Sequence, residues 1–129
     1  MGNALARIGY FEGTDPLLLS MLVAEGVETV PLANTVDGHG KNVNQLHKGE
    51  VNVVVGYFHK LIPAEHERTA SIPLIVDNRL SACRAHNIPV LLIVPAALHG
   101  KAENILRDIK TKVHFVAPEE LETQIRKYL

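Results

Sequence analysis

The sequence predicts an α/β fold, a three-layer α/β/α sandwich in which helices cover both faces of a five-stranded, mostly parallel, Rossmann-like sheet. The first observation is the run over residues 51–58, which is almost continuously apolar and β-branched instead of alternating. Burial on both faces of a parallel sheet requires such a run. The second is the regular alternation of strand-like and helix-like segments. The third is size: 129 residues, 47% of them hydrophobic, suit one core, so we expect a single domain over residues 1–129.

The first half of the chain should supply three of the five strands. Asp15 and Pro16 are typical of a helix start, and Gly26 is typical of the residue that follows a helix end. Leu46 is the residue that a short helix before Gly49 would turn inward. The expected elements are a strand over 6–11, a helix over 17–25, a strand over 27–32, a short helix over about 42–49 and the central strand over 51–58.

The second half should alternate in the same way after a polar connection over residues 59–71. We expect a helix over 73–87, a strand over 89–94 with Pro89 at its start, a further helix, a strand over 113–116 and a final helix that begins at 118–120. Spacings of three and four residues predict the inward side chains of the last two helices. These are Leu98, Ala102, Ile105, Leu106 and Ile109 in the first, and Leu121, Ile125 and Leu129 in the second.

Composition excludes several classes of protein. Thirteen basic and fourteen acidic residues leave a net charge near zero, with no long run of either sign, so nucleic acid is not an expected partner. The longest apolar stretch, residues 88–98, is too short for a bilayer and contains two prolines, so we expect no membrane contact. Cys83 is the one cysteine, which excludes an intrachain disulfide and favours buried packing in a cytoplasmic protein.

The topology predicts where a ligand would bind. Open parallel sheets bind ligands at the carboxyl ends of their strands. In this chain, polar residues cluster after the first three expected strands and are absent directly after the last two. The residues that this argument selects are Thr14, Asp15, Asn34, Asp37, His39, Lys41, His59 and Lys60.

The segment over residues 34–42 is the strongest local feature. It places a carboxylate, an imidazole, an ammonium group and two glycines, Gly38 and Gly40, between an expected strand and an expected helix. Glycines bring backbone N–H groups close to a ligand, so an anion or metal site is indicated. Nine residues also exceed the usual length of about 2–6 for such a loop, which favours a binding role. The alternative is a simple turn at Asp37-Gly38, with Asn42 capping a helix.

The segment matches none of the motifs that it partly resembles. A P-loop would need glycine at position 35 and Ser or Thr at position 42, where this sequence has Thr35 and Asn42. A dinucleotide fingerprint needs three glycines after the first strand, whereas Gly38 and Gly40 are two and follow the second. Asp37-Gly38-His39 is similar to the Asp-x-His-x-x-Gly pattern of cobalamin-binding domains, in which histidine ligates cobalt. In this sequence, Asn42 occupies the position of the glycine that the pattern requires. The cofactor therefore stays unspecified.

Seven histidines raise the question of a metal site. Their spacing contains no His-Glu-x-x-His motif and no close pair with a third ligand, so we expect no metal. His39 and His59 are the two at the expected ligand face, where an imidazole can act as an acid or base near neutral pH. Most of the remaining histidines should lie on the surface; these five are His47, His66, His86, His99 and His114.

One family resemblance covers about residues 36–94. Residues 44–55, a polar loop, Asp77 through Cys83 and Asn87-Ile88-Pro89-Val90 resemble the methylglyoxal-synthase-like domain. That family includes lyases acting on a triose phosphate and regulatory domains that bind phosphorylated nucleotides or metabolites. The resemblance implies an anionic-metabolite binder.

The resemblance also implies which residues stand in the family's site. Those residues are Asn34, Thr35, Asp37, His39 and Lys41. Two departures speak against lyase activity. The family's Gly-Thr-rich phosphate loop is replaced by Ala33-Asn34-Thr35, and its catalytic Asp would fall near His39, with Asp37 close by.

Three functional hypotheses follow. In the first, the chain binds a small phosphorylated or carboxylated metabolite; in the second, it is an enzyme in which Asp37 or His39 is a general base and His59 polarises an oxyanion. The third is an interaction module. A homo-oligomer is left open. The ligand-binding residues expected for the first hypothesis are Thr14, Asn34, Thr35, Gly38, Gly40, Lys41 and Lys60.

Overall fold

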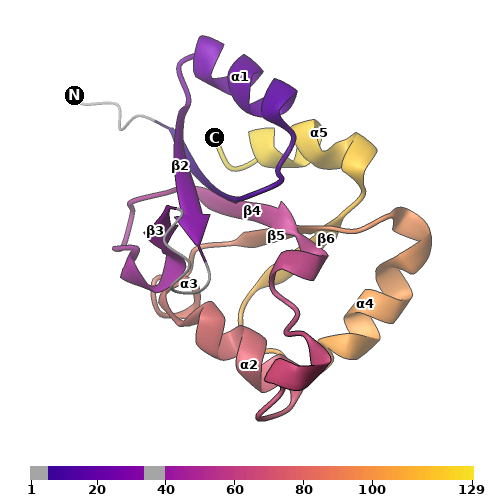
Figure 1. The fold of residues 1–129 in the computed structure, drawn as a ribbon. Helices are drawn as coiled ribbons and strands as arrows, with labels where there is room; N and C mark the ends of the chain where they lie inside the picture. Colours follow the sequence, from indigo (N-terminus) through magenta and orange to yellow (C-terminus); the bar gives the residue numbers. More distant parts are fainter. Residues whose placement is uncertain (1–5, 34–39) are drawn as a thin grey trace.

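The protein is built on one sheet of six parallel strands, with helices on both of its faces (Figure 1). The computed structural model describes residues 6–33 and 40–129. The α/β fold is confirmed, with one strand more than the five expected, because a two-residue strand extends one edge. The strands are β1 (Arg7–Phe11), β2 (Glu28–Ala33), β3 (Lys41–Asn42), β4 (Val53–Tyr57), β5 (Val90–Ile93) and β6 (Val113–Val116).

The order of the strands is β3-β2-β1-β4-β5-β6, so the chain builds the sheet outward from the middle in two directions. Gly9 of β1 lies opposite Val30 of β2 on one side and opposite Val54 of β4 on the other. The direction of building therefore reverses between β1 and β4. In open α/β sheets, this reversal opens a crevice at the carboxyl ends of the two central strands, where ligands bind.

Helices α1 (Pro16–Ala24) and α5 (Leu121–Arg126) cover one face of the sheet. Side chains at alternate positions of the strands point toward them, as the period of two in a β-strand dictates. Together they form a fully apolar core layer. Its buried members are Ile8, Leu18, Leu22, Val27, Val53, Val55, Leu91, Ile93, Val116, Leu121 and Ile125.

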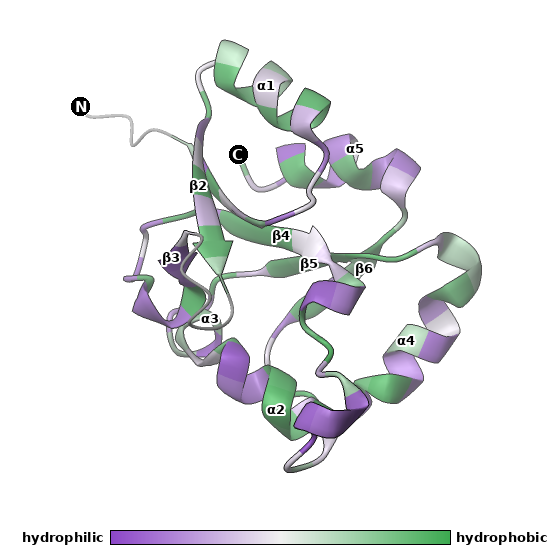
Figure 2. Ribbon diagram, in the orientation of Figure 1, coloured by the Kyte–Doolittle hydropathy of each residue, from purple (hydrophilic) through white to green (hydrophobic). Residues whose placement is uncertain are grey.

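Helices α2 (Ile72–Arg79), α3 (Ser81–Ala85) and α4 (His99–Ile105) belong to the opposite face. In Figure 2, hydrophobic residues run along β4 and β5, whereas α2 and α5 carry hydrophilic residues as well. The short 3₁₀ helices complete the connections. They are η1 (Val43–Gln45), η2 (Phe58–Lys60), η3 (Glu65–Glu67), η4 (Ala96–Leu98) and η5 (Pro118–Glu120).

The helix expected over residues 73–87 is two helices, which meet at Leu80. The side chain of Asn44 enters this break and binds the backbone on both sides of it. The short helix expected over 42–49 is also wrong: β3 and η1 occupy the start of that segment. Leu46 is nevertheless buried, as expected, because the inward position depends on the core and not on the type of turn.

Part of the expected apolar stripe of α4 faces solvent. Ala102 and Leu106 are buried, whereas Leu98 and Ile105 are 44% and 39% exposed. The regular helix α4 begins at His99, and Leu98 belongs to the preceding 3₁₀ helix η4. The spacing of three and four residues that begins at Leu98 therefore does not follow one continuous α-helix. Leu129, also expected to face inward, is 40% exposed because α5 ends at Arg126.

The structure bears on Cys83 and on membrane-spanning helices. Cys83 is 1% exposed, and this burial raises the pKa of its thiol to about 12, so it is protonated and packed in the core at neutral pH. Within residues 6–33 and 40–129, no helix combines the length and the apolar character that crossing a membrane would need.

Candidate functional site

The first loop of the site connects β1 to α1 and is held in a defined shape by its own side chains. The Thr14 hydroxyl donates to the Phe11 carbonyl at 2.7 Å, and Thr14 is buried. The Asp15 carboxylate accepts from the Leu17 N–H at 2.9 Å, which caps the helix that Pro16 begins. Thr14 and Asp15 thus shape the loop through local hydrogen bonds.

Gly13 and Lys60 lie together where the loops after β1 and β4 meet. A β-carbon on Gly13 would lie 3.6 Å from the Lys60 Cε, so the lysine side chain passes over the first loop. Gly13 has a φ of +93°, a conformation that favours glycine. Lys60 is half-buried and belongs to η2, directly after β4. Two of the three loops expected at the site are therefore in contact.

His59, next to Lys60, is exposed. Its ring lies 6.0 Å from that of Tyr57, centroid to centroid, at an angle of 38°. The side chain is therefore accessible at the carboxyl end of β4, where the sequence places it.

Gly40 and Lys41 mark the far edge of the sheet, at β3. A β-carbon on Gly40, whose φ is +100°, would lie 2.8 Å from the Pro31 carbonyl oxygen, so the chain passes β2 closely here. The Lys41 Nζ lies 2.5 Å from Glu50 Oε2, and Glu50 Oε1 accepts from the His47 N–H at 2.9 Å. The hydrogen bond from Lys41, followed by the one from His47, lowers the pKa of Glu50. Lys41 therefore holds the segment after β3 by an ion pair.

The expected site residues consequently fall into three groups. Lys60 and His59 come from η2, directly after β4, and the Lys60 side chain meets the loop that contains Gly13 and Thr14. Gly40 and Lys41 lie two strands away from β1. Asn34, Thr35, Asp37, Gly38 and His39 lie outside the described residues.

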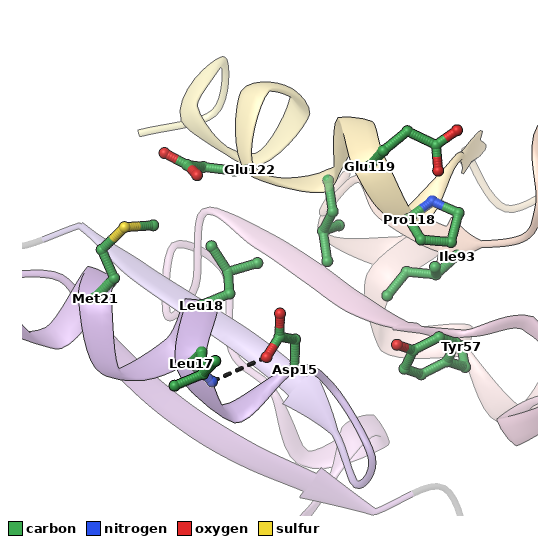
Figure 3. A pocket seen from close by; sticks show the side chains of 10 residues that line it. Asp15, Leu17, Leu18, Met21, Tyr57, Ile93, Pro118, Glu119 and Glu122 are labelled. Carbon is green, nitrogen blue, oxygen red and sulfur yellow. Dashed lines mark hydrogen bonds between the residues drawn. The ribbon is translucent and has the colours of Figure 1, made fainter.

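A cavity of about 350 Å³ lies between α1 and α5 at the same edge of the sheet (Figure 3). Both helices contribute their first turns, and β4 and β5 contribute the residues at their carboxyl ends. The lining residues are Asp15, Leu17, Leu18, Met21, Tyr57, Ile93, Pro118, Glu119, Leu121 and Glu122.

Sequence reasoning found Asp15 but missed the other polar residues of this cavity. Tyr57 is the last residue of β4. The sequence does not distinguish a tyrosine whose hydroxyl faces a cavity from one that is packed in the sheet. Glu119 and Glu122 follow β6, and the sequence argument selects no polar residue after this last strand. Their position in η5 and in the first turn of α5, the elements that follow the last strand, was the signal that could have found them.

An ion-pair network joins α1 to α5 beyond the cavity. Arg126 Nη1 and Nη2 donate to the two carboxylate oxygens of Glu25 at 2.8 and 3.1 Å, and Arg126 Nε donates to Glu122 Oε2 at 3.1 Å. These bonds raise the pKa of Arg126 and lower the pKa of Glu25. Because all three side chains are exposed, we expect the network to orient the helices more than to stabilise the fold.

No protein-family model matches the chain, and no curated protein matches it at a significant level. Among the described residues, no group of three or more His, Cys, Asp or Glu side chains is placed to hold a metal ion. The geometry of the sheet edge is therefore the basis on which a function is inferred.

Proposed function

We propose that the protein binds a small anionic metabolite, phosphorylated or carboxylated, where the loops after β1 and β4 meet. The observation that carries this proposal is the Lys60 side chain lying over Gly13 at the point where the strand order reverses. An ammonium group and the glycine of the loop after β1 are brought together there. This combination is suited to a negative charge.

The remaining polar residues have different parts in this proposal. Thr14 shapes the loop, because its hydroxyl donates a hydrogen bond to the Phe11 carbonyl. Lys41 forms an ion pair with Glu50 at β3, whereas Lys60 is the cation that lies beside the first loop. Gly40 and the neighbouring residues of the glycine-rich segment, Asn34, Thr35 and Gly38, would complete the ligand contacts. The resemblance to the methylglyoxal-synthase-like domain is in keeping with this class of ligand.

Binding is favoured over catalysis because the Lys60 side chain lies over Gly13, whereas the general bases expected from the sequence, Asp37 and His39, lie outside the described residues. The enzyme hypothesis stays a prediction that depends on Asp37 and His39, together with the exposed His59. A cytoplasmic location and a homo-oligomer also stay predictions.

The proposal is tested by measuring thermal unfolding of the purified protein against sugar phosphates, nucleotides and dicarboxylates. A compound that binds the native state must raise the melting temperature. Lys60→Ala should weaken the affinity for an active compound at least about tenfold, which corresponds to about 1.4 kcal/mol. Asp37→Ala and His39→Ala extend the test to the glycine-rich segment.

Lys112→Ala is the matched control. Lys112 is exposed and directly precedes β6, so it lies at the opposite, amino edge of the sheet. This variant loses the same charge and should bind like the wild type. If no compound raises the melting temperature, or if Lys60→Ala binds as tightly as the wild type, the proposed site is wrong and the interaction module gains support.

A further inference from the structure

The cavity between α1 and α5 differs in its chemistry from the proposed anion site. Three of its lining residues are carboxylic acids, Asp15, Glu119 and Glu122, and Tyr57 adds a hydroxyl group. Among the described residues that line it, none is a lysine, arginine or histidine. An anion would be repelled by this lining, whereas a cation would be attracted.

The three carboxylates are not equivalent. Glu122 shares the Arg126 cation with Glu25, so its charge is partly compensated. One Asp15 oxygen accepts from Leu17, and the other points into the space between the two helices in Figure 3. Glu119 belongs to η5, lies at the rim in Figure 3 and forms no ion pair with any residue in the described part of the chain. Asp15 and Glu119 therefore leave the cavity with a net negative charge.

The rest of the cavity is apolar, and this second observation points to a ligand independently of the charges. Leu18, Ile93 and Leu121 are buried side chains that form its inner wall. Leu17 also lines the cavity and is 80% exposed, the highest value among the large apolar side chains described. An apolar group resting here would remove Leu17 from water, which is favourable.

We propose that this cavity binds an organic amine with an apolar body. The ammonium group bonds to the inward oxygen of Asp15, with Glu119 at the rim and the Tyr57 hydroxyl pointing toward Asp15 (Figure 3). The apolar body rests on Leu17 and Leu18. A volume of about 350 Å³ lies at the lower end of ordinary ligand pockets, so the amine is small. This inference goes beyond the proposed anion site and does not rest on it.

The test uses 2-phenylethylamine as the probe, with 2-phenylethanol as its neutral analogue and 3-phenylpropionate as its anionic analogue. Isothermal titration at low salt measures affinity, and amide chemical shifts in NMR spectra locate the site. We expect the amine to bind at least tenfold more tightly than the alcohol and the carboxylate not to bind. The shifts should include Tyr57 and Ile93.

Two variants and one control decide the role of the charges. Asp15→Asn should weaken amine binding about tenfold while α1 stays capped, because asparagine caps helices as well as aspartate does. Glu119→Gln should weaken it less. Glu120→Gln removes the same charge from an exposed neighbour that does not line the cavity, and should have no effect.

Three outcomes would overturn the inference: equal affinities for the amine and the alcohol, wild-type affinity in Asp15→Asn, or shifts confined to residues outside the cavity. Failure of the amine to bind leaves the anion proposal standing, since Lys60 does not line this cavity. Conversely, Lys60→Ala should bind the amine like the wild type.

Discussion

Asp77 shows how a single buried charge can organise two elements. Its side chain lies in α2 and is 4% exposed. Its carboxylate accepts from the Lys110 N–H at 2.9 Å, from the Thr111 N–H at 2.9 Å and from the Thr111 hydroxyl at 2.7 Å. These bonds tie α2 to the segment that precedes β6. Buried charges are retained where such bonds replace their hydration.

Removing this carboxylate should be costly. Asp77→Ala leaves the N–H groups of Lys110 and Thr111 without their acceptor, and we expect it to lower the free energy of unfolding by about 3 kcal/mol. Urea denaturation measures this. Asp108→Ala, an exposed acid two residues before Lys110, is the control and should change the value by less than about 0.5 kcal/mol. A loss as small as the control's would show that the bonds contribute little.

Asp77 should also make stability depend on acid pH. Burial alone would raise its pKa, but the hydrogen bonds from the Thr111 hydroxyl and the two backbone N–H groups outweigh burial, so the pKa lies below its ordinary value. A lowered folded-state pKa stabilises the protein above the unfolded-state pKa of about 3.9, and this contribution is lost as pH falls through the folded-state pKa.

The comparison that isolates this effect is wild type against Asp77→Asn in urea denaturation from pH 2 to 8. The difference in unfolding free energy should be constant above about pH 5 and shrink below about pH 4. A difference that stays constant down to pH 2 would contradict the ionised form of Asp77.

At the scale of elements, the break between α2 and α3 depends on Asn44. Its Nδ2 donates to the Asn78 carbonyl at 2.9 Å, and its Oδ1 accepts from the Ala82 N–H at 3.1 Å. The Ser81 hydroxyl donates to the same Oδ1 at 3.0 Å. One amide side chain thus serves the end of α2 and the start of α3, groups that every helix terminus must satisfy from outside.

Asn44→Ala should therefore loosen α3 in particular. We expect a loss of about 1.5 kcal/mol in unfolding free energy and faster hydrogen exchange at the Ala82 N–H. Gln45→Ala changes the next residue of η1, which is exposed and makes no side-chain hydrogen bond with the described part of the chain, and should leave both values unchanged. Unchanged exchange at Ala82 in Asn44→Ala would show that the break has another cause.

At the scale of the whole molecule, two apolar layers share one sheet. Leu22 of α1 and Leu80 between α2 and α3 are both 0% exposed but lie on opposite faces. The strands between them contribute alternate side chains to each layer. Neither layer can lose its sheet face without exposing the other, so the chain should unfold as one unit.

Leu22→Ala and Leu80→Ala test this single-domain expectation. Each should lower the free energy of unfolding by about 3 kcal/mol, and circular dichroism and tyrosine fluorescence should report the same transition in both. Leu17→Ala, at an 80% exposed position, should change it by less than about 0.5 kcal/mol. Separate transitions for the two layers would indicate two folding units.

The sequence by itself determined the fold class and the position of most elements. Strands that are buried on both faces are apolar almost throughout, so the continuous apolar runs of β4 and β5 predicted these strands. Asp15, Pro16 and Gly26 placed α1 to within a residue, because caps and turns are local chemistry. The parallel arrangement then placed Lys60 and His59 at the carboxyl edge of the sheet, directly after β4.

The tertiary structure decided what depends on contacts between distant residues. Asn44 divides a helix more than 30 positions away, and Lys41 pairs with Glu50 instead of facing the first loop. The cavity combines residues of α1, β4, β5 and α5, and its acidic character arises from that assembly. Local sequence patterns report the period and caps of one element. Which side chains meet across elements is decided by the order of the strands and the packing of helices on them.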